Sequence, residues 1–217
     1  GGGVGFPTFL VNSVVVAVGA VIGNVVSCSM AAYAFARLRF RFSGVMFGFA
    51  LVTIMLPAHV TLIPQYVIFQ KLSLVDSFVP LILPKLLATD SFFVFLMVQF
   101  IRGLPRDLDE AATIDGCGPY RTFWHIVLPL ARPAIVTTSI FTFIWTWNDF
   151  FSQLIYLSSA ENYTIPMGLR LFIDETSSSS YGAMFAMSVL SLVPVVLFFA
   201  AFQRFLVQGV ATTGLKG

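Results

Sequence analysis

The chain has 217 residues, of which 58% are hydrophobic and only 10% are charged. A soluble domain carries about 25% charged residues, so this composition predicts a chain that lies largely in the apolar interior of a membrane. The formal net charge is only +2 and the basic residues are scattered, which excludes the charge pattern of a nucleic-acid-binding protein.

The sequence lacks the patterns of common catalytic, nucleotide and metal sites. It contains no Gly-Lys pair, so it has no Walker A loop for ATP, and no His-Glu-x-x-His or Ser-His-Asp arrangement at usable spacing. His59 and His125 have no Cys or His companion at ligand spacing, and Cys28 and Cys117 fall in parts of the chain that are not expected to meet. We therefore expect no catalytic residue, no metal site and no disulfide.

Five apolar stretches are long enough to cross a bilayer, which takes ~20 helical residues. The expected spans are about 8–36, 44–63, 79–101, 133–157 and 181–206. Gly19 and Gly23 predict close helix packing in the first span, and Pro57 predicts a kink or break in the second. The fold class is therefore an all-α polytopic membrane protein, with residues 1–217 forming one domain.

The stretch 104–130, LPRDLDEAATIDGCGPYRTFWHIVLPL, is the longest central segment too polar to lie in a membrane; we call it the elbow. It predicts two short helices around a glycine corner. Asp107 followed by Glu110 is a variant of the capping box, with Asp107 as the cap. Gly116 tolerates the left-handed conformation that ends a helix, and Pro119 suits the start of the next one.

Helical spacing predicts one face for each elbow helix. In the first helix, Leu108, Ala111 and Ala112 at i, i+3 and i+4 would form a small apolar face. In the second, the residues expected to share a face are Tyr120, Phe123, Trp124 and Val127. An ordinary loop with an interfacial helix would show the same spacing.

The identities of the elbow residues favour a more specific interpretation. The elbow resembles the signature EAA-x3-G-x9-I-x-L-P. The matching residues are Glu110-Ala111-Ala112, then Gly116 after three residues, and then Ile126-x-Leu128-Pro129 after nine more. That signature marks the membrane subunits of binding-protein-dependent ABC importers. The resemblance implies a type I ABC importer transmembrane domain whose first elbow helix is a coupling helix that docks on a cytoplasmic ATPase. The residues expected to couple the chain to the ATPase are Asp107, Glu110, Ala111, Ala112, Gly116, Ile126, Leu128 and Pro129.

Further motifs resemble the carbohydrate-uptake branch of this family, such as the second membrane subunits of maltose importers. These motifs are Leu56-Pro57, Ile63-Pro64, Gln99-Phe100, Trp147-Asn148-Asp149-Phe150 and the tail 209–217. Members of this branch usually have six spans, so we expect that the first of the usual six is missing from the five visible here.

The resemblance also implies the function and the partners. The chain is expected to be a permease subunit in the plasma membrane of a bacterium or archaeon, where it moves a sugar, oligosaccharide or polyol. Its expected partners are a second permease subunit, an ATPase dimer that binds ATP and Mg²⁺, and an external solute-binding protein. No cofactor and no enzymatic activity are expected in this chain, and no nucleic-acid partner.

The distribution of basic residues predicts the orientation independently of the family. If the elbow and the turn at Arg37–Arg41 lie on one side, that side holds nine of the twelve basic residues. By the positive-inside rule the elbow and the C-terminus are then cytoplasmic. The nine are Arg37, Arg39, Arg41, Arg102, Arg106, Arg121, Arg132, Arg204 and Lys216, and the external side holds Lys71, Lys85 and Arg170.

Polar residues inside spans suggest a solute path, because such residues usually face a cavity. The candidates are Asp90, Trp145, Asn148 and Asp149, and Trp147 beside them could also stack on a sugar ring. Two alternatives remain open from the sequence. The two Trp residues could belong to an aromatic belt at the outer interface, with Asn148 and Asp149 at the level of the outer headgroups, and Asp90 could be a hydrogen-bonding group between packed helices.

Other functions remain open at this stage. One is an ABC permease for another small solute, such as an amino acid or a phosphate ester. Another is a secondary carrier, which broken helices and an intramembrane Asp90 would suit. A carrier does not need the whole elbow signature in one cytoplasmic loop, so the signature favours the ABC permease.

Overall fold

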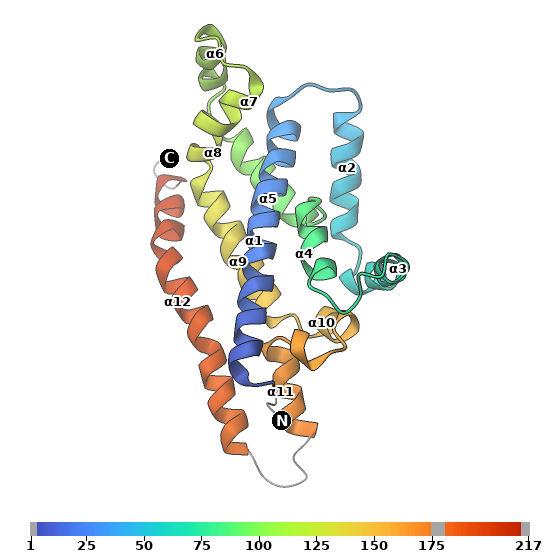
Figure 1. Cartoon of the computed structure of the whole chain (residues 1–217). Coiled ribbons are helices and arrows are strands. Elements are labelled where there is room, and N and C mark those ends of the chain that lie inside the picture. Colours follow the sequence, from blue (N-terminus) through green and yellow to red (C-terminus); the bar gives the residue numbers. More distant parts are fainter. Residues whose placement is uncertain (1–3, 175–180, 214–217) are drawn as a thin grey trace.

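The computed structural model describes residues 4–174 and 181–213, and every regular element within those ranges is helical (Figure 1). The elements, in order, are α1 Phe6–Arg37, α2 Ser43–Ile54, α3 Ala58–Lys71, α4 Val79–Leu86, α5 Ser91–Arg102, α6 Asp107–Ile114, α7 Pro119–Thr122, a π-helical turn Phe123–Val127, α8 Leu128–Leu130, α9 Arg132–Asn148, α10 Phe151–Tyr156, a 3₁₀ turn Ala160–Asn162, α11 Ile165–Asp174 and α12 Tyr181–Thr213.

Helix α1 lies at the centre of the bundle and packs against α4, α5 and α9, while α12 covers α9 (Figure 1). The contact face of α1 is built from small side chains, among them the fully buried Ala17, Ala20 and Ala32. Small residues bring helix backbones close together in lipid, where apolar burial alone gives no driving force. The predicted packing role of the two glycines is confirmed. A Cβ atom on Gly19 would lie 2.8 Å from Cδ1 of Ile82, and one on Gly23 would lie 3.0 Å from Cγ of Leu86.

We expect Gly23→Leu to push α4 away from α1 and to destabilise the protein by about 1–3 kcal/mol, the usual cost of overpacking. Gly44→Leu is the matched control, because a Cβ at Gly44 meets nothing within 4 Å. The measurement is the thermal unfolding midpoint of the two purified variants in detergent. Equal midpoints for both variants would show that Gly23 does not set the distance between α1 and α4.

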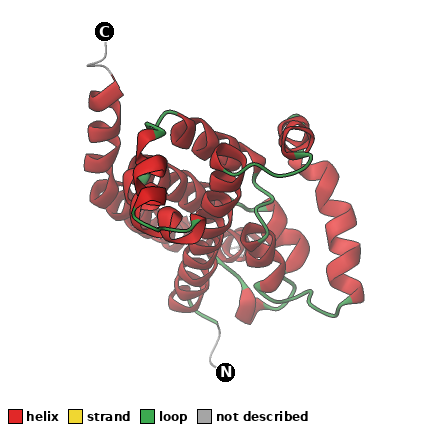
Figure 2. Ribbon diagram, turned by 90° about the horizontal axis from the view of Figure 1, so that it is seen from above, coloured by secondary structure: helices red, strands yellow, loops and turns green. Residues whose placement is uncertain are grey.

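The predicted spans are more broken than their apolar stretches suggest. Among the described residues, three helices are long and apolar enough to cross a membrane, and the expected five are reached only if each of two bent helix pairs counts as one span. The second predicted span, 44–63, is not one helix, because α2 and α3 meet at 106° around Pro57. Helix α3 then continues to Lys71 and lies across the direction of the other helices (Figures 1 and 2).

The third predicted span, 79–101, agrees with the candidate membrane span Val79–Arg102, although a short break divides it, and the fourth ends earlier than expected. Residues 87–90 separate α4 from α5, and Ala88 there has a φ of 54°. Helix α9 ends at Asn148 instead of continuing to residue 157, and the Asp149 carboxylate accepts a 3.0 Å hydrogen bond from the Ser152 N–H at the start of α10. A side chain that binds free N–H groups starts a new helix, so the chain turns at this point.

A carboxylate joins the α3–α4 loop to the segment after α10. The Asp76 side chain accepts hydrogen bonds from the N–H groups of Ser158 and Ser159, both at 2.9 Å, and from the Ser159 hydroxyl. Desolvation of the Asp76 carboxylate opposes ionisation, but these bonds outweigh it and hold the pKa at about 2. Asp76 therefore stays ionised and keeps the two loops together, which fixes α10 beside α3 and α4.

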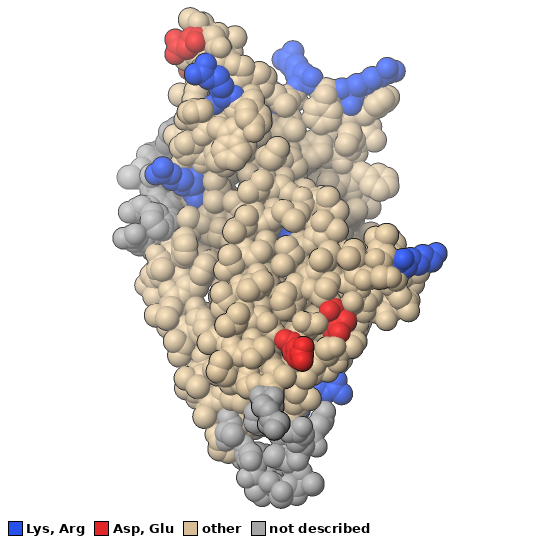
Figure 3. Space-filling model, viewed as in Figure 1, with Lys and Arg blue, Asp and Glu red and all other residues tan. Residues whose placement is uncertain are grey.

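Charged side chains gather mainly at the ends of the molecule. In the space-filling view, Lys and Arg concentrate over the α6–α7 end and the turn between α1 and α2, and the middle of the visible face is largely uncharged (Figure 3). This distribution is expected of a bundle whose middle faces lipid.

Candidate functional site

The elbow projects from one end of the bundle as α6, a glycine corner and α7 (Figure 1). The predicted capping box is wrong. Arg106 is the N-cap of α6, no side chain caps the helix, and the Arg106 carbonyl already accepts the N–H groups of Asp109 and Glu110. Asp107 and Glu110 instead lie in the first turn, where their negative charges stabilise the positive end of the helix dipole.

The predicted glycine corner is confirmed. Gly116 has a φ of 76°, which residues with a side chain rarely adopt. Two hydrogen bonds close the end of α6. The Cys117 N–H donates to the Ala112 carbonyl at 2.8 Å, and the Gly116 N–H donates to the Thr113 carbonyl at 3.0 Å. This pair of bonds is the Schellman motif, which fixes the direction in which the chain leaves α6.

Helix α6 presents a different face from the one expected. Ala112 is only 2% exposed, so its side chain packs against its own chain. The exposed positions at i, i+3, i+4 and i+7 are Asp107, Glu110, Ala111 and Ile114. Ile114 is 86% exposed, although it is a large apolar residue at the end of a polar segment. We call these four residues the outer face of α6.

One arginine connects α6 to the first span. Arg37, the last residue of α1, has a side chain that is only 6% exposed; it forms a 3.2 Å ion pair with Asp109 in α6. Its guanidinium also donates a 2.8 Å hydrogen bond to the carbonyl of Leu104, just before α6. Charge-assisted bonds of this kind are stronger than neutral ones, so α6 is held to the end of α1.

The second half of the elbow packs into the bundle. Phe123 and Val127 are buried in a core formed with α1 and α5, and the Phe123 ring lies 5.2 Å from that of Tyr33. Tyr120 and Trp124 are exposed, so the four residues predicted to share one face do not do so. A π-turn over Phe123–Val127, whose hydrogen-bonding pattern is wider than that of an α-helix, interrupts the helix here.

Proline accounts for the irregular backbone at the end of the signature. Pro129 has no N–H, so it cannot close a helical turn, and the Leu128 N–H instead bonds to the Phe123 carbonyl. The signature residues Ile126 and Leu128 are partly exposed, Pro129 is exposed, and the chain then bends by 75° into α9. The elbow is thus joined to α1, α5 and α9 without a flexible linker.

A cavity of about 980 Å³ lies between α2, α3, α4, α5, α9 and α10. Three of the predicted path residues line it: Asp90, Trp145 and Asp149. Asn148 does not, since its amide donates to the Ile144 carbonyl at 2.8 Å and its side chain is exposed elsewhere. Trp147 is also absent from the wall, because it is only 4% exposed and its ring N–H donates to the Ser191 carbonyl in α12.

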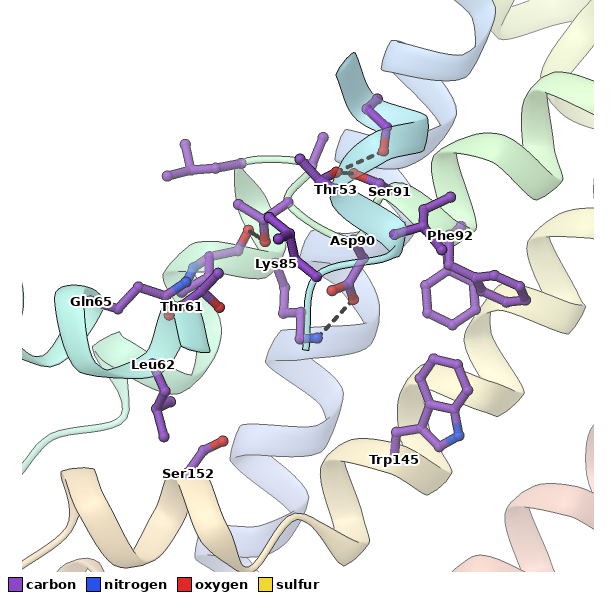
Figure 4. Close-up of a pocket in the computed structure, with 18 of the residues that line it drawn as sticks. Thr53, Thr61, Leu62, Gln65, Lys85, Asp90, Ser91, Phe92, Trp145 and Ser152 are labelled. Atoms are coloured by element: carbon purple, nitrogen blue, oxygen red, sulfur yellow. Dashed lines mark hydrogen bonds and ion pairs between the residues drawn. The ribbon is translucent and has the colours of Figure 1, made fainter. Parts of the chain in front are cut away.

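Asp90 lies at the break between α4 and α5, where its carboxylate forms a 2.7 Å ion pair with Lys85 (Figure 4). Sequence reasoning missed Lys85 as a wall residue and counted it among the external charges. The signal was a lysine five residues before an aspartate within an apolar stretch. The Ser27 hydroxyl of α1 donates a 2.7 Å hydrogen bond to the Lys85 carbonyl, which holds this break in place.

The cavity wall also carries aromatic and hydroxyl groups. Trp145 is 51% exposed and its ring lies 6.0 Å from that of Phe92, which also lines the wall (Figure 4). The hydroxyls of Thr53 and Ser91 hydrogen-bond each other at 2.7 Å. The cavity therefore combines an apolar ring surface with several donors and acceptors, an arrangement typical of small-molecule sites.

The family model described as "Binding-protein-dependent transport system inner membrane component" matches residues 8–212. The chain belongs to this family. The permease is 33% identical over 210 residues to the arabinooligosaccharides transport system permease protein AraQ of Halalkalibacterium halodurans, covering 97% of this chain and 74% of that protein. It is 32% identical over 212 residues to the trehalose/maltose transport system permease protein MalG of Thermococcus litoralis, covering 98% and 76%.

A solved structure shares the fold of the permease. It is the crystal structure of a bacterial ABC transporter involved in the import of the acidic polysaccharide alginate, with a TM-score of 0.81 and 23% identity over 92% of this chain and 74% of that one. The resemblance read from the elbow signature, and the expected fold class of a type I ABC importer permease, are therefore confirmed.

Proposed function

We propose that this permease imports a neutral carbohydrate, driven by ATP hydrolysis on a separate ATPase. AraQ and MalG are named for arabinooligosaccharides and for trehalose and maltose, which supports a sugar as solute. The observation that carries the proposal is the cavity wall, which holds both the exposed Trp145 ring and the Lys85–Asp90 pair. An indole ring can cover the apolar C–H face of a sugar while the ion pair binds its hydroxyls.

The outer face of α6 is the proposed docking surface for the ATPase. It holds an exposed apolar residue, Ile114, after two acidic residues, and the Arg37–Asp109 pair connects α6 to α1. Closure of two ATPase subunits, which would bind ATP and Mg²⁺, would then move α6 and α1 together. The other proposed partners are a second permease subunit and an external solute-binding protein; this chain itself would hold no cofactor and catalyse no reaction.

The proposed location is the plasma membrane of a bacterium or archaeon, with the elbow in the cytoplasm. The α6 end and the turn after α1 lie at the same end of the bundle, as the count of basic residues requires (Figures 1 and 3). The expected cytoplasmic C-terminus ends in residues 214–217, which lie outside the described part of the chain.

Transport by the assembled importer in vesicles tests the function. We expect uptake of at least one of maltose, trehalose or an arabinooligosaccharide. This uptake should require both Mg-ATP and the solute-binding protein. Trp145→Ala should reduce this uptake at least about tenfold, because it removes an apolar surface worth about 1.5 kcal/mol or more. The matched control is Phe150→Ala, which removes an exposed ring that does not line the cavity.

Two results would contradict the proposal. Uptake of an amino acid or a phosphate ester, with none of the three sugars transported, would assign another solute class to the permease. Sugar uptake without ATP would instead identify a secondary carrier.

A further inference from the structure

The Lys85–Asp90 pair is a fixed feature of the cavity wall. Its atoms are 2.7 Å apart and the two side chains are 27% and 25% exposed, so both can reach a solute without leaving each other. The pair lies at the break between α4 and α5, where hydroxyls hold the backbone: Ser27 donates to the Lys85 carbonyl and Thr89 donates to the Pro84 carbonyl, at 2.7 and 2.8 Å. Figure 4 shows the two charged groups directed toward each other among the residues that line the cavity.

The charges of the wall do not cancel. Among the described residues that line the cavity, the charged ones are Lys85, Asp90 and Asp149, which gives one positive and two negative charges and a net charge of −1. Lys85 is already paired with Asp90. The Asp149 carboxylate accepts the Ser152 N–H, which keeps it in place but does not neutralise it.

This arrangement treats neutral and anionic solutes differently. A sugar hydroxyl both donates and accepts hydrogen bonds, so it can bind Asp90 and Lys85 at once and leave the pair intact. An anion has to compete with Asp90 for Lys85 while it lies near Asp149. Repulsion between like charges is stronger beside a protein wall than in bulk water, because the effective dielectric constant is lower there.

We propose that the Lys85–Asp90 pair, together with Asp149, makes this cavity select neutral polyhydroxy solutes over anionic ones. The inference rests on the proposed function, in which the cavity forms part of the solute path. It assigns to Lys85 and Asp90 a role in specificity that charge-changing substitutions can isolate, because each changes the net charge of the wall by one.

Three variants form a charge series on the intact importer. The net charge of the wall is −1 in the unchanged protein, −2 in Lys85→Gln and 0 in Asp90→Asn. The double variant has a net charge of −1 again but lacks the ion pair. Lys71→Gln is the control, because it removes a positive charge from the exposed end of α3, which does not line the cavity.

The local charge is read by the reactivity of a cysteine in the wall. Ser91→Cys is introduced into a Cys28→Ser, Cys117→Ser background, and the assembled complex in vesicles is treated with anionic, cationic and neutral methanethiosulfonates. The ratio of the anionic to the cationic rate should rise at least about threefold in Asp90→Asn and fall by a similar factor in Lys85→Gln, as expected for one unit charge a few ångströms away. The double variant and Lys71→Gln should keep the starting ratio.

The three reagents separate the possible failures. If the neutral reagent does not label residue 91, the cavity is closed to water, and both the proposed path and this inference fail. If the neutral reagent reacts but the ratio is the same in all variants, the wall does not select by charge, and only this inference fails. If the double variant has the same ratio of anionic to cationic rates as Asp90→Asn, the change in rate comes from an altered structure and not from charge. That result would overturn the inference as well.

Discussion

Ile114→Asp is expected to release the ATPase from the permease. Ile114 is 86% exposed at the end of α6, so the change should leave the fold of the permease unaltered. In the assembled importer the same side chain would be buried against the ATPase. Its removal costs about 1.5–3 kcal/mol of apolar burial, and the new carboxylate adds the cost of desolvating a charge at the interface.

The expected result is a binding constant weaker by at least about tenfold to a hundredfold. The measurement is the amount of ATPase that co-purifies with the tagged permease. Tyr120→Asp is the matched control, since it places the same charge on a residue that is 69% exposed in α7, outside the outer face of α6. Full retention of the ATPase by Ile114→Asp would show that the outer face is not the docking surface.

Arg37→Met is expected to separate ATP hydrolysis from transport. The change removes the 3.2 Å ion pair with Asp109 and the 2.8 Å bond to the Leu104 carbonyl, while a methionine fills much of the same space. Hydrogen bonds of charged groups contribute about 1.5–3 kcal/mol, so α6 should lose most of its attachment to α1. The outer face of α6 is unchanged, and the ATPase should remain bound.

The quantity to measure is the amount of sugar transported per ATP hydrolysed in vesicles. We expect this ratio to fall at least about fivefold, the factor that corresponds to about 1 kcal/mol. Arg41→Met is the control, because Arg41 is an exposed arginine in the turn that follows α1. Arg37→Lys should restore part of the coupling, since it keeps the charge but lacks the forked geometry. An unchanged ratio in Arg37→Met would mean that movement reaches the spans by another route.

Local features of the elbow were predictable from the sequence. The corner at Gly116 depends on a left-handed residue and on two hydrogen bonds from Gly116 and Cys117 to the last turn of α6, all of which involve residues close together in the sequence. The outer face of α6, which we propose as the docking surface, was not predictable, because the orientation of α6 involves contacts with distant residues such as the Arg37–Asp109 ion pair. In this orientation Ala112 is buried and Ile114 is exposed.

The cavity was predictable only in part, for a similar reason. Asp90, Trp145 and Asp149 stood out as polar or amphipathic residues in apolar stretches, and they do line one cavity. The break that brings Lys85 beside Asp90 contains Ala88 with a φ of 54°. This conformation is usual for glycine or asparagine but not for alanine, so the sequence does not indicate it. The inward direction of Trp147 depends on packing against α12, which spacing along α9 does not reveal.

Cysteine cross-linking from the two sides of α6 tests the docking claim most directly. In a Cys28→Ser, Cys117→Ser background, Ala111→Cys and Ile114→Cys place a thiol on the outer face, and Ala112→Cys places one on the buried side. With a short bifunctional thiol reagent, the permease should cross-link to the ATPase from positions 111 and 114 and not from position 112. Cross-linking from position 112, or none from position 114, would contradict the assignment of the outer face of α6 as the surface through which ATP hydrolysis drives this permease.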